Sequence, residues 1–114
     1  VGYTDLVHLD GSIERLVDNN EDAEVDPWEI TNGAAGYNAV SRHIVYAGGV
    51  SKHDGKPLDT RTLEQKKALA DYVRNFHSRF PQIRIVGHNE LNSKKACPSF
   101  DVQEWLRSLG IRQA

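Results

Sequence analysis

The sequence has little of several features that would each indicate a particular class of protein. It contains a single cysteine, Cys97, which excludes an internal disulfide framework and a four-cysteine zinc site. No apolar run approaches the ~20 residues of a membrane-spanning helix, so we expect no contact with a membrane. A signal peptide is not expected either, because the chain starts with VGYTDLVHLDG, which does not have that pattern. The 14 lysines and arginines against 16 aspartates and glutamates give a charge of −2, which argues against nucleic-acid binding.

The composition is that of one globular domain. The chain has 114 residues, and domains cluster at about 100–150 residues. Apolar residues make up 39% and charged residues 26%, a balance typical of globular proteins. No repeat, low-complexity tract or linker divides the chain. We therefore expect a single domain over residues 1–114, acting as a monomer.

The first part of the chain predicts a β-hairpin followed by a polar loop. Residues 3–9 and 12–17 flank Asp10-Gly11, a dipeptide typical of a two-residue hairpin turn because both positions tolerate positive φ. Residues 18–27, DNNEDAEVDP, are acidic and predict a solvated surface loop.

The clearest helix is predicted to begin after Thr62. Thr62 and Gln65 have the spacing of a capping box, in which each side chain pairs with the other residue's backbone N–H. Apolar side chains then recur at spacings of four, three and four, which places them on one helix face. They are Leu69, Val73, Phe76 and Phe80. Pro81 is expected to end the helix.

Two further strands and a short helix complete the predicted fold. Residues 43–47 are largely apolar and predict a central strand, and residues 83–86 predict another strand. Residues 102–109 predict a short helix that ends at Gly110. Strands interleaved with helices in this order indicate an α/β domain with a single mixed β-sheet flanked by helices.

His88 and Cys97 are the candidate functional residues. His88 lies just beyond the end of the predicted strand, where α/β sheets usually place binding groups, and Cys97 comes nine positions later. Imidazole and thiolate are both zinc ligands, so the two residues could share an ion. Alternatively, nearby lysines could activate the Cys97 thiolate as a nucleophile. A third interpretation is a surface histidine beside a small buried cysteine, and the spacing leaves all three open.

The remaining histidines are expected at the surface or in satisfied structural positions. They are His8, His43, His53 and His77.

Two segments, residues 87–91 (GHNEL) and 95–101 (KACPSFD), resemble zinc-dependent N-acetylmuramoyl-L-alanine amidases of the phage-lysozyme type, which share a fold with peptidoglycan recognition proteins. The likeness covers nearly the whole chain. It extends through Val1-Gly2-Tyr3, Asp10-Gly11, Gly36-Tyr37-Asn38, Ser41, Gly48-Gly49, Asp54-Gly55-Lys56 and Asp59-Thr60-Arg61-Thr62.

The resemblance implies a metal-dependent hydrolase. His88 would be the second histidine ligand of a Zn²⁺ ion and Cys97 its cysteine ligand, while Tyr3 and Lys95 would be catalytic. The implied reaction is hydrolysis of the amide that joins N-acetylmuramic acid to L-alanine in bacterial peptidoglycan. Zinc would activate a water molecule, and Lys95 could stabilise the oxyanion. Tyr3 could position the water or pass a proton to the leaving amine.

The sequence departs from the family pattern at the other histidine ligand. In the family this histidine lies on a strand upstream of the Gly-Tyr motif, and no histidine occupies that position before Tyr3. His43 also stands where the family has a small residue, Thr4 replaces a histidine, and Gly33 stands where a pocket histidine is common. We therefore expect residues 1–114 to lack the N-terminal strand of the domain and to bind zinc weakly without it.

The resemblance also implies where the protein acts and which alternative functions compete with the amidase. The protein is expected to act on the cell wall, in the periplasm or outside the cell, as a phage endolysin would after release from the cytoplasm. A non-catalytic module of the same fold, binding muropeptides without hydrolysing them, is the alternative that the missing histidine favours. A cysteine hydrolase built on Cys97 and His88 is the third hypothesis.

Overall fold

The computed structural model describes residues 3–18, 22, 24–34 and 36–113. Its strands are β1 (Asp5–Val7), β2 (Ile13–Arg15) and β3 (Ile44–Tyr46), and its helices are α1 (Leu63–Arg79), α2 (His88–Leu91) and α3 (Val102–Ser108). Two short 3₁₀ helices, η1 (Pro27–Glu29) and η2 (Asn38–Val40), precede β3. Gly2 of the Gly-Tyr motif and residues 19–21 and 23 of the predicted acidic loop lie outside the described residues.

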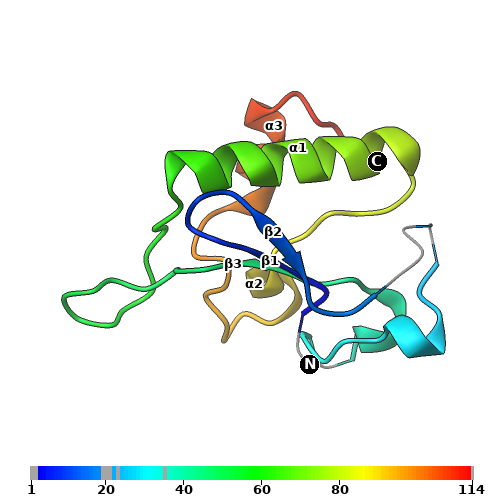
Figure 1. Cartoon of the computed structure of the whole chain (residues 1–114), viewed down its shortest axis with the longest axis horizontal. Helices are drawn as coiled ribbons and strands as arrows, with labels where there is room; N and C mark the ends of the chain where they lie inside the picture. Colours follow the sequence, from blue (N-terminus) through cyan, green and yellow to red (C-terminus); the bar gives the residue numbers. More distant parts are fainter. Residues whose placement is uncertain (1–2, 19–21, 23, 35, 114) are drawn as a thin grey trace.

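The sheet is mixed, as predicted. Its strands lie in the order β2-β1-β3, with β1 antiparallel to β2 and parallel to β3. The long helix α1 lies across this sheet (Figure 1) and packs Leu69 against Val7 and Tyr46. The α/β class is therefore confirmed, but β3 is not the central strand that the sequence predicts. Among the described residues, β3 forms an edge and β1 lies in the middle.

The hairpin is confirmed, although its turn is longer than predicted. The His8 N–H donates to the Ser12 carbonyl at 2.8 Å, and the Gly11 N–H donates to the His8 carbonyl at 2.9 Å. These bonds close a three-residue loop in which Gly11 has a φ of +86°. Within this loop, the Asp10 carboxylate accepts hydrogen bonds from the Ser12 hydroxyl and the Ser12 N–H. These bonds lower the pKa of the Asp10 carboxyl group. One glycine in the left-handed region is enough for this turn.

The capping box of α1 is confirmed and also joins the helix to the sheet. The Thr62 hydroxyl accepts a hydrogen bond from the Gln65 N–H, and the Gln65 side-chain oxygen accepts one from the Thr62 N–H. The buried Gln65 amide then donates to the carbonyl of Val7 at 3.2 Å and to that of Ala47 at 2.9 Å. This side chain therefore fixes the start of α1 against the ends of β1 and β3.

Replacing Thr62 with alanine should lower the free energy of unfolding by about 1 kcal/mol, because one N-terminal helix N–H loses its acceptor. The Thr62 hydroxyl also donates to the Leu9 carbonyl at 2.7 Å, so the hairpin loop loses a partner too. Urea unfolding followed by circular dichroism measures the change. Lys67→Ala, at an exposed position of the same helix, is the control and should change stability little. An equal loss in both variants would contradict the capping interpretation.

Residues 83–86 do not form the predicted strand. The Ile85 N–H donates to the Gln113 side-chain oxygen at 2.6 Å. The Ile85 carbonyl accepts from the side-chain amides of Gln103 at 2.9 Å and Gln113 at 2.8 Å. Glutamine side chains from α3 and the C-terminal segment thus take the place of a neighbouring strand at this residue. The segment leads directly into α2, a short helix that the sequence analysis did not predict.

The short helix α3 is confirmed, with the Asp101 carboxylate capping it by accepting from the Glu104 N–H. It ends before Gly110, which has a φ of +78°. Its buried side chains form the second part of the core with α1. This part contains Val73, Val102, Leu106 and Ile111. None of the helices formed by the described residues combines the length and apolarity needed to cross a bilayer.

The acidic loop is anchored rather than only solvated. The Arg42 guanidinium donates to the backbone carbonyls of Asp22 and Glu24, and it pairs with the fully buried Glu29 carboxylate at 3.1 Å. Glu29 also accepts from the Asp26 N–H at 2.8 Å. Arg42 lies just before β3, so this buried ion pair holds the described part of the loop and η1 against the start of that strand.

Candidate active site

Three of the four predicted site residues line one cavity. Tyr3, His88 and Cys97 border a space of about 280 Å³ that also contacts β3, α1 and residues 83–86. Lys95 is exposed and does not line this cavity. Three residues that are far apart in sequence therefore border one cavity, and Lys95 is not among its lining residues.

Gly87 allows His88 to lie against the cysteine loop. A Cβ atom at Gly87 would lie 2.9 Å from a Val102 methyl carbon and 3.2 Å from the Pro98 ring, so a side chain there would force α2 away from both. The next residue, Asn89, donates its backbone N–H to the Cys97 carbonyl at 2.8 Å. The short helix α2 is thus fixed directly to the backbone of Cys97.

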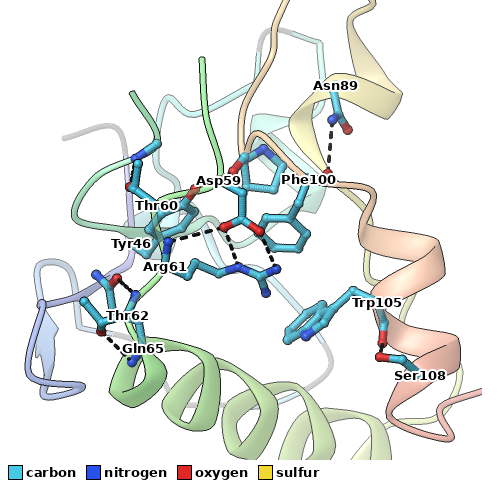
Figure 2. Close-up of polar contacts among 12 residues, drawn as sticks. Tyr46, Asp59, Thr60, Arg61, Thr62, Gln65, Asn89, Phe100, Trp105 and Ser108 are labelled. Carbon is cyan, nitrogen blue, oxygen red and sulfur yellow. Dashed lines mark hydrogen bonds and ion pairs between the residues drawn. The ribbon is translucent and has the colours of Figure 1, made fainter. Parts of the chain in front are cut away.

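The loop that carries Cys97 is held by several hydrogen bonds. The Tyr46 hydroxyl of β3 donates to the Pro98 carbonyl at 2.7 Å, and the Ser99 hydroxyl donates to the Gly49 carbonyl at 2.9 Å. The Asn89 amide donates to the Phe100 carbonyl at 3.4 Å, as Figure 2 shows. These contacts come from β3, from the turn after it and from α2.

Arg61 adds a further contact that the sequence analysis did not assign. Its guanidinium forms two hydrogen bonds of 2.9 Å with the Asp59 carboxylate and lies 3.5 Å from the centre of the Phe100 ring (Figure 2). The hydrogen bonds from Arg61 lower the pKa of Asp59. Stacking of a buried guanidinium on an aromatic ring is favourable, so Arg61 ties the segment before α1 to the residues after Cys97. In the sequence, Arg61 was marked only as part of the motif Asp59-Thr60-Arg61-Thr62, which belongs to the family resemblance.

The protonation of Cys97 bears on the choice between metal ligand and nucleophile. Burial raises the pKa of the Cys97 thiol, so without a bound cation the thiolate is scarce at neutral pH. Reactive cysteines need the opposite shift. A metal ion, in contrast, deprotonates a coordinating thiol outright. The environment of Cys97 therefore disfavours the cysteine-hydrolase hypothesis.

His43 is not the satisfied structural histidine that the sequence predicts. It lies at the cavity beside β3, and its Nδ1 atom is 2.6 Å from the Thr31 hydroxyl. Its Nε2 atom is buried and has no hydrogen-bond partner among the residues that the structure describes. Burial, with a smaller contribution from the charge of His88, lowers the pKa of His43. The sequence pattern did not reveal this environment of His43, because its partner Thr31 lies in a segment without regular secondary structure.

The donor set fits zinc chemically but is incomplete. His88 and Cys97 supply the nitrogen and sulfur donors that zinc prefers, whereas a catalytic zinc takes three protein ligands. Within residues 3–18, 22, 24–34 and 36–113, no group of three or more histidine, cysteine, aspartate or glutamate side chains is arranged to hold a metal. The described residues thus offer two ligands, and a third would have to come from elsewhere.

Comparisons with known proteins find similarity in both sequence and structure. No family model matches the sequence. The endolysin of Enterobacteria phage K11 is 30% identical over 108 residues, which are 95% of this chain and 65% of that protein. The chain therefore spans less than two thirds of the length of this relative.

Two solved structures share the fold. The N-acetylmuramoyl-L-alanine amidase LysC from Clostridium intestinale URNW has a TM-score of 0.69 at 19% identity, over 97% of this chain and 66% of that one. The Ph2119 endolysin from a Thermus scotoductus MAT2119 bacteriophage has a TM-score of 0.67 at 25% identity, over 98% of this chain and 65% of that one. The mixed sheet with its helices is thus the fold of amidase endolysins.

Proposed function

We propose that this chain is the catalytic part of a peptidoglycan-degrading N-acetylmuramoyl-L-alanine amidase. The observation that carries the proposal is the meeting of His88, Cys97 and Tyr3 at one cavity, in a fold shared with a named amidase. The similarity to a phage endolysin supports it. The substrate would be bacterial peptidoglycan, reached at the cell wall by a monomeric enzyme.

His88 and Cys97, which both line the cavity, would hold a zinc ion. The resemblance implies a histidine as the third protein ligand, and no described residue completes such a set with His88 and Cys97. When bound, the metal would supply Lewis-acid polarisation of the scissile carbonyl and activation of water. The hydrogen bonds from Tyr46 and Asn89 to the loop around Cys97 would hold the sulfur in place before the metal arrives.

Tyr3 and Lys95 would both act on the substrate. Tyr3 lines the cavity and is 36% exposed, so its hydroxyl can reach both water and a bound amide. It would orient the attacking water or deliver a proton to the leaving amine. The Lys95 ammonium, exposed two residues before Cys97, would stabilise the oxyanion once substrate covers it.

The proposal is tested by product analysis with the full-length protein and purified peptidoglycan. Amidase activity releases peptides with a new L-alanine amino terminus and creates no new reducing sugar ends. Activity should fall below a tenth of its starting value after treatment with 1,10-phenanthroline, because the activated water is lost, and return when Zn²⁺ is added.

Each other outcome would overturn a specific part of the proposal. New reducing ends would indicate a glycosidase. Hydrolysis that survives chelation but is blocked by thiol alkylation would restore the cysteine-hydrolase hypothesis. Saturable muropeptide binding without turnover, even with added zinc, would identify a recognition module instead.

A further inference from the structure

The backbone and ring of His43 are both held in place. The His43 carbonyl accepts hydrogen bonds from the N–H groups of Thr4 at 2.6 Å and Asp5 at 3.4 Å, so its backbone is fixed to the start of β1. Its Nδ1 atom lies 2.6 Å from the hydroxyl of Thr31, a residue with no exposed surface. The position and the rotation of the imidazole are therefore set by buried partners.

The partner of Nδ1 determines where the ring carries its proton. The Thr31 hydroxyl has one proton, and the His43 ring nitrogen is its only acceptor in the described part of the chain. If Nδ1 carried the ring proton, the Thr31 oxygen would accept from it, but the hydroxyl's own proton would then be buried without an acceptor. The hydroxyl therefore donates to Nδ1, and neutral His43 carries its own proton on Nε2. Protonated imidazole also carries a proton there, so Nε2 is a donor in both forms.

This donor has no acceptor among the described residues. The Nε2 atom is buried from solvent, yet it makes no hydrogen bond within residues 3–18, 22, 24–34 and 36–113. Unsatisfied buried donors are rare in native proteins, because water has been removed and nothing replaces it. His43 borders the same cavity as His88 and Cys97. Because the side chain of His43 lines this cavity, an acceptor that reaches Nε2 from the cavity would satisfy the donor.

We infer that His43 is a substrate-binding residue whose Nε2–H donates a hydrogen bond to an amide carbonyl oxygen of the peptide part of the substrate. This inference rests on the proposed function, because it takes a muropeptide as the molecule that enters the cavity. Among the described residues, His43 does not form a group of three metal-binding side chains with His88 and Cys97, so a role as third metal ligand has no support in the arrangement of the cavity.

The test measures binding without hydrolysis. Isothermal titration of the metal-free full-length protein with N-acetylmuramoyl dipeptide should show affinity about 10-fold weaker for His43→Phe, which removes the donor, since one hydrogen bond is lost. His43→Gln, which keeps an N–H near the Nε2 position, should recover most of the affinity. His53→Phe makes the same change at an exposed histidine and should bind like the wild type.

A nuclear magnetic resonance measurement of the ring tautomer keeps the inference falsifiable if His43→Phe does not fold. Labelled His43 should show a proton on Nε2, and Thr31→Val should weaken dipeptide binding by allowing the other tautomer. A proton on Nδ1 in the wild type, or equal dipeptide affinity in wild type and folded His43→Phe, would overturn the inference and leave the amidase proposal standing. Absence of both dipeptide binding and hydrolysis in the wild type would overturn both.

Discussion

Replacing Cys97 with serine in the full-length protein is expected to lower peptidoglycan hydrolysis by about 10³-fold or more. Loss of an outer hydrogen-bond partner of a metal ligand already lowers activity or metal affinity by about 10- to 100-fold, and loss of the ligand itself should exceed this. Serine is similar in size to cysteine, but its hydroxyl does not bind zinc as a thiolate does. His88→Ala is expected to have the same effect. Release of soluble fragments from labelled peptidoglycan and zinc content after dialysis measure the two losses.

The control for this experiment lies one residue away. Ala96→Ser adds a hydroxyl at an exposed position of the same loop, and it should leave both activity and zinc content close to those of the wild type. The melting temperature of Cys97→Ser in the metal-free state should also remain close to that of the wild type, because the loop keeps its backbone hydrogen bonds. Hydrolysis by Cys97→Ser within 10-fold of the wild type would show that the cysteine is not a ligand.

Arg42→Ala is expected to lower the free energy of unfolding by about 3–5 kcal/mol, because it leaves a buried carboxylate without its cation. The Glu29 side chain is fully buried and the Arg42 side chain is 11% exposed, so water cannot replace the lost partner. The backbone carbonyls of Asp22 and Glu24 lose a donor in the same variant. Urea unfolding of the wild type and the variant measures the difference.

Two further variants separate the buried charge from other effects of the substitution. Arg74→Ala removes an arginine from an exposed position of α1 and should change stability by less than about 0.5 kcal/mol. Adding Glu29→Gln to Arg42→Ala should recover part of the lost stability, since the buried charge is gone. A loss below 1 kcal/mol in Arg42→Ala would contradict the assigned importance of this ion pair.

Local patterns predicted those parts of the fold whose stabilising contacts lie close in sequence. The capping box at Thr62 and Gln65 involves residues three apart, and the hairpin bonds join residues near Gly11. Residues 83–86 have the composition of a strand, yet side chains 18 and 28 positions further along take the backbone bonds of Ile85. No local pattern contains that information, so the prediction of a strand was wrong.

For the candidate site, the roles of the residues stay predictions, and only their positions can be compared with the structure. The loop motif around Cys97 and the position of His88 indicated that these residues could meet, and the structure brings both to one cavity. The unpartnered nitrogen of His43 could not be predicted, because it depends on which atom faces the buried Thr31 hydroxyl. The contact of Arg61 with Phe100 joins residues 39 positions apart, and its quoted motif carried no indication of that partner.

The hydrogen bonds around Cys97 restrict the movement of its loop before any ligand binds. Tyr46, Gly49 and Asn89 hold this loop from separate parts of the chain, so the loop cannot open alone without breaking contacts to the core. We expect the hydrogen-bonded amides of this loop to exchange more slowly than those of a loop without such contacts. The sulfur is thus preorganised, and little conformational entropy of the loop remains to be lost when a ligand binds.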